Sequence, residues 1–337
     1  MGLLPSAADE NRRADADPHW QSAADWLWRQ RKHAPANADV WDLRWRWMMH
    51  GEAETLYHNV KAGRYRLSPM LIYGRGRSAR AMWSAADSLV LKWVALQVEK
   101  PLPRPERCHH LRGKGVRYSL RAVKEALSSG RFQFVHRTDI RGYYEHIRKS
   151  QLISLVNRYV PDPVCRELIT QYAHYSVEYG GEIYKPVNGI PRGCALSPLI
   201  GAALLHHIDG YYRSLNPDEV YYVRYMDDFL LLTRTRWQLR RGIARLGEFF
   251  ELSGFERHPD KTQTGKIQKG FDWPGIWYAE DGATIASRAL NNHRERRARL
   301  YEQARRKGIQ NEEALERVRA YDERWSKWAE GMLAACR

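Results

Sequence analysis

Residues 220–233 read VYYVRYMDDFLLLT, in which two β-rich segments flank a pair of acids, Asp227 and Asp228. This pattern predicts a hairpin that carries both acids at its tip. Acidic residues are common at exposed turns, but the hydrophobic segments on either side indicate that this turn lies between buried strands of a sheet. Carboxylates in that position repel each other unless a cation, in particular a metal ion, offsets their charge.

A further strand is expected upstream of the hairpin. Residues 132–139 read FQFVHRTD and alternate in the manner of a strand that ends at Asp139. If this strand lies beside the hairpin, Asp139 supplies a third carboxylate. Three carboxylates provide hard oxygen ligands, which suit Mg²⁺, with Mn²⁺ as an alternative ion. Two such ions, roughly 3.5–4 Å apart, can stabilise the attacking and leaving oxygens of an in-line phosphoryl transfer. The pattern therefore indicates nucleotidyl transfer.

Helices are expected on both sides of these strands. One helix is expected to take Ser197 as its N-cap and Pro198 in its first turn, and to continue to about Ser214. Apolar residues at helical spacing predict the other helices, over residues 20–31, 40–49, 84–98 and 236–252, the last of them ending at Gly254.

Composition narrows the class of protein. The chain has 337 residues, 43% of them hydrophobic, which is enough to bury the core of one large or two modest domains. Lys and Arg total 55 against 39 Asp and Glu, and the net charge of +16 favours a polyanionic partner such as nucleic acid. No apolar stretch approaches the ~20 residues of a membrane span. Because the four cysteines lie far apart and the N-terminus lacks a secretory pattern, we expect a cytoplasmic protein without membrane association or structural zinc.

Two loops rich in Gly and basic residues, 73–80 and 111–117, could contact phosphates. Neither loop matches the P-loop pattern G-x-x-x-x-G-K-[ST] or the dinucleotide-binding pattern G-x-G-x-x-G. The sequence therefore argues against a mononucleotide P-loop and against a Rossmann fold. A solvated turn is an equally good interpretation of each loop.

The sequence resembles the reverse transcriptases, because five of their motifs occur in the expected order and separation. They are TDIRGYY at 138–144, GIPRGCALSP at 189–198, YMDD at 225–228, HPDKT at 258–262 and GFDWPG at 270–275. The resemblance implies an α+β fold of the right-hand type, with fingers, an antiparallel-sheet palm and a thumb. It divides the chain into a helical N-terminal extension over 1–70, fingers over 71–130 with part of 150–190, a palm over 131–280 and a helical basic thumb over 281–337.

The resemblance also implies roles for individual residues. The catalytic and metal-binding set would be Asp139, Asp227, Asp228, the carbonyl of Ile140, and Lys261 near the departing pyrophosphate. The nucleotide-binding set would be Arg77, Arg80, Tyr144, Arg192 and Gly193. The set that contacts nucleic acid would be Trp273 and Gly275 in the turn that grips the primer, and Arg294, Arg297 and Arg305 on the thumb.

Several of these roles have a plain structural alternative. Tyr144 matches the steric gate, whose ring collides with a ribose 2′-hydroxyl and so favours deoxynucleotides, but it could be a core tyrosine. Lys261 could be a solvated loop lysine. Arg192 stands where many relatives carry Gln, which leaves nucleotide preference open. The basic thumb helix could be a solvated charged helix, since Glu295 and Glu302 interrupt its basic run.

The activity implied by the resemblance is RNA-directed DNA polymerisation, in which a primer 3′-hydroxyl attacks the α-phosphate of a dNTP and releases pyrophosphate. The motifs look most like those of bacterial group II intron, retron and defence enzymes. The implied partners are an RNA template and a DNA or RNA primer, and mobility or antiviral defence would require a dedicated noncoding RNA or an accessory protein. Two alternatives remain open: a nucleotidyltransferase that copies DNA or adds untemplated nucleotides, and an RNA-binding maturase-like module with vestigial catalysis.

Overall fold

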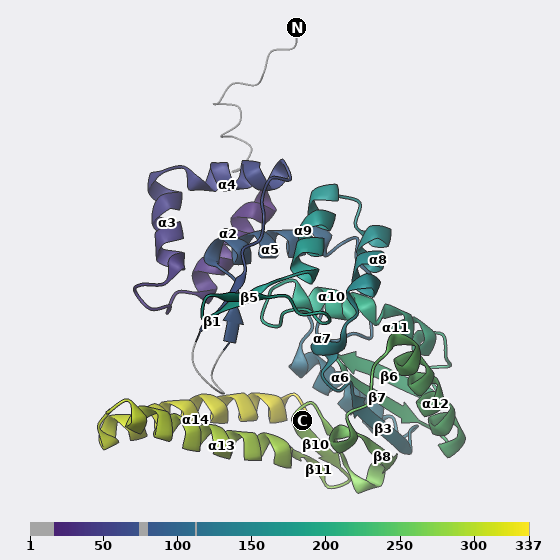
Figure 1. Cartoon of the computed structure of the whole chain (residues 1–337). Coiled ribbons are helices and arrows are strands. Elements are labelled where there is room, and N and C mark those ends of the chain that lie inside the picture. The colour runs from purple at the N-terminus through teal and green to yellow at the C-terminus, as the bar shows by residue number, and fades with distance from the viewer. Residues whose placement is uncertain (1–16, 74–79, 112, 337) are drawn as a thin grey trace. The chain divides into compact units, whose positions relative to one another are not determined.

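The computed structural model describes residues 17–73, 80–111 and 113–336 (Figure 1). The chain forms two compact units, each made of two separate segments. Unit 1 comprises Met1–Arg104 and Gly142–His206, and unit 2 comprises Pro105–Arg141 and His207–Arg337. The chain therefore leaves unit 1 for unit 2, returns, and leaves again. The finer division into extension, fingers, palm and thumb stays a prediction.

Unit 1 is mainly helical and carries one small sheet. Its helices are α2 (Pro18–Gln30), α3 (Asp39–Met49), α4 (Glu52–Lys61), α5 (Ala85–Val98), α7 (Tyr143–His146), α8 (Lys149–Tyr159), α9 (Pro163–Ala173) and α10 (Ser197–Leu204). Its strands are β1 (Met70–Tyr73), β2 (Arg80–Met82), β4 (Val177–Tyr179) and β5 (Glu182–Tyr184), in the order β2-β1-β4-β5.

Helix α5 forms the centre of unit 1, because most of its side chains are buried and α2 and α9 both pack against it. Its start is fixed by Ser84, whose hydroxyl accepts a hydrogen bond from the Asp87 N–H. Asp17 fixes the start of α2 in the same way, since its carboxylate accepts hydrogen bonds from the N–H groups of His19 and Trp20. These caps explain why helices begin at these two points.

Unit 2 contains two antiparallel sheets. Its strands are β3 (Phe134–Asp139), β6 (Val220–Tyr225), β7 (Asp228–Thr233), β8 (Gln263–Lys266), β9 (Phe271–Trp273), β10 (Ile276–Ala279) and β11 (Gly282–Ile285). One sheet has the order β6-β7-β3-β8 and the other β11-β10-β9. The helical elements are α6 (Val116–Ser128), α11 (His206–Arg213), α12 (Arg236–Ser253), α13 (Ser287–Arg306) and α14 (Asn311–Ala334), with short 3-10 turns η2 (Pro259–Lys261) and η3 (Ile267–Lys269).

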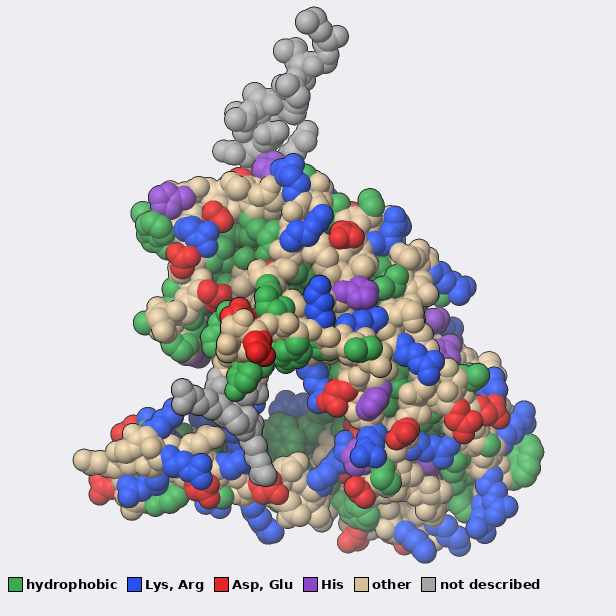
Figure 2. Space-filling view, viewed as in Figure 1, with side chains coloured by type: hydrophobic (Ala, Val, Ile, Leu, Met, Phe, Trp, Pro, Cys, Tyr) green, Lys and Arg blue, Asp and Glu red, His purple; other side chains and the backbone are tan. Residues whose placement is uncertain are grey.

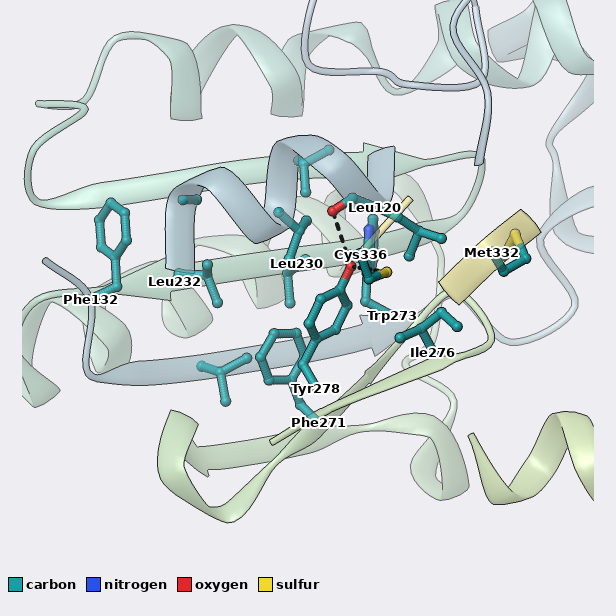
Figure 3. Packing of buried hydrophobic residues seen from close by; sticks show 14 residues of the cluster. Leu120, Phe132, Leu230, Leu232, Phe271, Trp273, Ile276, Tyr278, Met332 and Cys336 are labelled. Carbon is teal, nitrogen blue, oxygen red and sulfur yellow. Dashed lines mark hydrogen bonds between the residues drawn. The ribbon is translucent and has the colours of Figure 1, made fainter. Parts of the chain in front are cut away.

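A hydrophobic cluster in unit 2 joins α6, both sheets and the end of α14 (Figure 3). It brings together Leu120 of α6, Leu230 of β7, Phe271 of β9 and Tyr278 of β10. The Tyr278 hydroxyl donates a hydrogen bond to the Leu120 carbonyl over 3.0 Å and lies 3.3 Å from the Cys336 sulfur. The cluster therefore fixes α6 and the end of α14 against both sheets. Helices α13 and α14 continue from it as an antiparallel pair (Figure 1).

The helix expected from Ser197 to Ser214 is broken into α10 and α11. The break falls at Leu205, whose backbone leaves the helical region, and the following His206 ring lies 2.7 Å from the Ala203 carbonyl. Ser197 is also not the N-cap, which is Leu196. The Ser197 hydroxyl instead donates to the Pro191 carbonyl over 2.7 Å, because Ser197 already lies inside the first turn.

The other predicted helices are present within a few residues of their expected ends. Gly254 terminates α12 with a φ of 74°, in the left-handed region that glycine adopts readily. Across the described ranges, none of the helices combines the length and the apolar character that a membrane crossing requires.

Candidate active site

The predicted catalytic strands lie side by side in unit 2. Strand β3 pairs antiparallel with β7, and the register places Asp139 directly opposite Asp228. Strands β6 and β7 form the predicted hairpin, with Tyr225 opposite Asp228. The Ile140 N–H also donates a hydrogen bond to the Asp227 carbonyl over 3.3 Å. The adjacency expected between residues 132–139 and the hairpin is therefore confirmed.

The tip of the hairpin has an unusual backbone. Met226 has a φ of 56° and is the one non-glycine residue of the described chain with a positive φ. Such a conformation costs a side-chain-bearing residue about 1–3 kcal/mol and persists only where the surroundings hold it. Its N–H donates to His110 Nδ1 over 2.9 Å, and its carbonyl accepts from Arg224 Nη1 over 2.7 Å. Both polar groups of Met226 are thus held from outside the turn.

Arg224 belongs to a buried ion pair. Its guanidinium is fully buried and binds both carboxylate oxygens of Asp209, with the Nε contact at 3.0 Å. The Tyr222 hydroxyl donates a third hydrogen bond to Asp209 over 2.7 Å. Nη1 of Arg224 donates to the Met226 carbonyl, so the buried network holds the backbone of the hairpin turn.

The two acids at the tip of the hairpin have raised pKa values. Burial raises the pKa of Asp227 to about 7, and the neighbouring charges of Asp139 and Asp228 contribute to the rise. Burial also raises the pKa of Asp228, although the charge of Arg137 opposes that rise. The ionised form of Asp227 is therefore costly unless a cation lies close to it.

Two basic side chains already pair with these acids. Lys261 Nζ pairs with Asp139 Oδ2, and Arg137 Nη2 pairs with Asp228 Oδ1. Arg137 is only 1% exposed, and its Nη1 also donates to the Lys261 carbonyl over 2.6 Å. Arg137 was not among the predicted site residues. The signal for it was present in the sequence, since Arg137 and Asp139 are two apart in a strand and therefore share a face.

The carboxylates retain features of a cation site. Asp139 Oδ1 is buried and has no hydrogen-bond partner, and a buried carboxylate oxygen without a partner is costly. Nevertheless, the described residues contain no group of three or more His, Cys, Asp or Glu side chains placed to hold a metal ion. The predicted ligand set of three aspartates and the Ile140 carbonyl therefore stays a prediction.

A cavity in unit 1 gathers three of the predicted nucleotide-binding residues. It has a volume of about 760 Å³, and Arg80, Arg192 and Gly193 all line it. Arg192 pairs with Glu145 over 3.1 Å and lies 5.9 Å from the centre of the Tyr144 ring. Tyr144 itself is 8% exposed. Arg77 lies outside the described residues.

The loop that carries Arg192 is held close to α7. Gly189 has a φ of 83°, and a Cβ there would lie 2.9 Å from the carbonyl oxygens of Tyr144 and Glu145. Only glycine fits such an approach. The Ile190 N–H donates to the Tyr144 carbonyl over 2.9 Å. Sequence reasoning missed that Arg31 and Trp26 of the N-terminal region also line this cavity, because nothing in their local pattern distinguishes them from other helical residues.

The predicted primer-grip residues differ in exposure. Trp273 is fully buried, and its Nε1–H donates to the Ser119 hydroxyl over 3.0 Å. The Trp273 side chain therefore supports the turn from inside the core. It offers no surface to a nucleic acid, so the prediction that Trp273 contacts nucleic acid directly is corrected. Gly275 lies in the turn between β9 and β10 with a φ of 90°, and its N–H donates to Asp272 Oδ1 over 3.2 Å.

The predicted thumb arginines lie on the exposed surface of α13. Arg297 pairs with Asp322 of α14 over 3.0 Å, and Arg305 donates to the Ile309 carbonyl over 3.2 Å. Arg294 is exposed and forms no ion pair with any residue that the structure describes. Their contact with nucleic acid stays a prediction.

Comparison with known proteins identifies the family. Residues 86–278, more than half of the chain, match the family described as reverse transcriptase (RNA-dependent DNA polymerase). The chain belongs to the reverse transcriptase family. The matched range contains Asp139, the Asp227–Asp228 pair and Lys261.

Two relatives place this reverse transcriptase among known proteins. The group II intron-encoded protein LtrA of Lactococcus lactis subsp. cremoris is 29% identical over 112 residues, which are 33% of this chain and 17% of LtrA. A telomerase from Candida albicans, solved with a fragment of telomeric RNA, is 14% identical with a TM-score of 0.50, and the match covers 72% of this chain and 51% of the telomerase. The telomerase likeness supports the predicted α+β polymerase fold. The chain spans about half of the telomerase and a much smaller part of LtrA.

Proposed function

We propose that this reverse transcriptase extends a primer 3′-hydroxyl with dNTPs on an RNA template and releases pyrophosphate. The observation that carries the proposal is the register that sets Asp139 opposite Asp228, beside Asp227, within the range that matches the family. An RNA-binding module without catalysis gives no reason for a raised Asp227 pKa between two further carboxylates.

Asp139 and Asp227 are the proposed ligands of two divalent ions, with Mg²⁺ favoured by their hard oxygen donors and Mn²⁺ as an alternative. The unpartnered Asp139 Oδ1 and the costly ionised form of Asp227 support this assignment. Bound ions would supply charge neutralisation for the attacking and leaving oxygens. Asp228, which is paired with Arg137, would add negative charge beside the ions. The Ile140 carbonyl is a further proposed ligand.

The basic residues have proposed roles of their own. Arg137 positions Lys261 by donating a hydrogen bond to the Lys261 backbone carbonyl. The proposed role of the Lys261 ammonium is to stabilise negative charge on the departing pyrophosphate. Arg80 and Arg192 of the unit 1 cavity suit a triphosphate, because guanidinium groups bind phosphate through paired N–H donors. Tyr144, next to Arg192, is the proposed gate against ribonucleotides.

The proposed location is the cytoplasm of a bacterium. The protein would belong to a retroelement or to a defence system, together with a dedicated RNA and an accessory protein. The likeness to an intron-encoded protein supports the retroelement, and four buried free cysteines suit a reducing compartment.

Purified protein incubated with a labelled primer is expected to incorporate dNTPs on an RNA template and to stop when EDTA removes divalent ions. The measurement is product length on a denaturing gel with an RNA template, a DNA template of the same sequence and no template. Ribonucleotides serve as the control for sugar selection. Extension only on DNA, or equally without a template, would instead favour the two alternative transferase activities.

The contact of His110 with the catalytic turn gives a second expected result. His110→Leu removes the acceptor for the Met226 N–H, so we expect kcat for extension to fall about 5- to 30-fold, the equivalent of about 1–2 kcal/mol, with KM for dNTP nearly unchanged. His110→Asn keeps an oxygen acceptor at a similar position and should recover most of the loss. Equal loss in both variants, at unchanged thermal stability, would show that the hydrogen bond does not matter.

A further inference from the structure

A groove in unit 2 lies outside the residues discussed so far as catalytic. It is bounded by α13, α14 and the turn that joins β9 to β10, and its volume is about 510 Å³. The α13 side carries basic residues and the α14 side carries aromatic residues. The members that face each other are Arg288, Arg296 and Arg299 on α13, and Tyr321, Trp325 and Trp328 on α14.

The aromatic residues of α14 pack against one another and against His293 of α13. Trp325 lies parallel to His293, with 4.0 Å between ring centres and an angle of 17°, and Trp328 follows at 5.9 Å from Trp325. Trp328 is 37% exposed. A Cβ on Gly275 would lie 3.6 Å from the Trp328 ring, so the backbone of the turn closes one end of the groove. His293 Nδ1 is buried there without a hydrogen-bond partner.

The basic side is only partly neutralised. Arg288 pairs with Asp272 over 3.3 Å, and Arg299 pairs with Glu295 over 3.5 Å. Arg296 forms no ion pair with any described residue. On the face seen in Figure 2, Lys and Arg side chains over α13 and α14 are interspersed with Asp and Glu, so the outer surface of the pair is mixed in charge. The groove therefore combines an available guanidinium with an aromatic surface.

We propose that this groove binds an unpaired stretch of nucleic acid, with a base stacked on the Trp325 and Trp328 side and the phosphates along Arg296 and Arg299. Aromatic rings stack on the faces of bases, and those faces are covered inside a duplex but open in a single strand. Arginines track the backbone phosphates without reading sequence. This inference extends the proposed function by naming which form of nucleic acid is held here.

The test compares binding of the full-length protein to a short fluorescein-labelled RNA without secondary structure and to a blunt duplex of equal length, by fluorescence anisotropy without dNTPs. Trp325→Leu is expected to weaken binding of the unpaired RNA about tenfold and binding of the duplex less than about twofold. Arg296→Gln should reduce the slope of log Kd against log salt for the unpaired RNA by about 0.7. Trp237→Leu, an exposed tryptophan on α12, and Arg324→Gln, an exposed arginine of α14 outside the groove, are the matched controls.

Wild-type affinity in both groove variants, or an equal loss on the unpaired RNA and the duplex, would overturn the proposal. If Trp325→Leu does not fold, as judged by its thermal transition, Arg296→Gln decides alone, because its exposed side chain supports no packing. Since no nucleotide is incorporated in this assay, a protein that binds as expected but fails to extend a primer refutes the proposed function and leaves the groove assignment intact.

Discussion

Asp227→Asn is expected to abolish primer extension while nucleic-acid binding stays largely intact. The substitution removes a negative ligand for divalent ions, whose contribution to transition-state stabilisation is several kcal/mol. At about 1.4 kcal/mol for each tenfold change, kcat should fall by about 10³-fold or more. Single-turnover extension in Mg²⁺ measures this directly. Near-normal extension by the variant would defeat the assignment of Asp227.

The same substitution should make the metal-free protein more stable at neutral pH. The pKa of Asp227 is raised to about 7 in the folded protein, from 3.8 in the unfolded chain. The folded state therefore binds the extra proton between these two values, and stability declines as pH rises through that window. The amide introduced by Asp227→Asn carries no such charge, so in EDTA the variant should melt higher than wild type at pH 8, with a difference that shrinks toward pH 4. Asp260→Asn, an exposed carboxylate of η2, is the control.

Arg224→Met is expected to destabilise unit 2 by about 3–5 kcal/mol. The substitution leaves the Asp209 carboxylate buried without its partner, and breaking a buried ion pair from one side is far more costly than replacing both members. The melting temperature should fall on the order of 10 °C. Arg245→Met, which breaks an exposed pair with Glu248, should change stability by less than about 1 kcal/mol.

The double variant Asp209→Leu/Arg224→Met separates the contribution of Arg224 to folding stability from its contribution to holding the turn at Met226. It removes both charges, so it should recover much of the stability that Arg224→Met alone loses. It does not restore the hydrogen bond to the Met226 carbonyl, so extension should remain impaired. If extension recovers together with stability, Arg224 acts only through folding and the support of the turn is unimportant.

The sequence was most informative where chemistry and periodicity agree. The position of Asp139 at the end of a strand and of Asp227 at a hairpin tip follows from local alternation, whereas the pairing of the two strands entered only as the condition under which Asp139 joins the other acids. Gly254 ended α12 as expected, for the local reason that its backbone is left-handed. These features depend on residues that are close in the sequence.

Features set by distant contacts escaped prediction. His110 meets Met226 across 116 positions, and no periodic pattern connects them. Trp273 was expected at a nucleic-acid surface, but tryptophan suits a core as well as a stacking surface, and only the packing of α6 against β9 decides between them. Ser197 was expected to cap a helix, but a hydroxyl there can also bond to Pro191, and the loop geometry selects that partner.

The discontinuous build of unit 2 has a consequence for how the chain acquires its structure on the ribosome. Strand β3, which carries Asp139, has β7 on one side and β8 on the other, and both are synthesised some ninety to one hundred and thirty positions later. Until they emerge, β3 has no strand partner on either side and offers two unsatisfied edges, the kind of surface that invites aggregation. Nascent chains paused between β3 and β7 should therefore depend on chaperones more than the completed protein does.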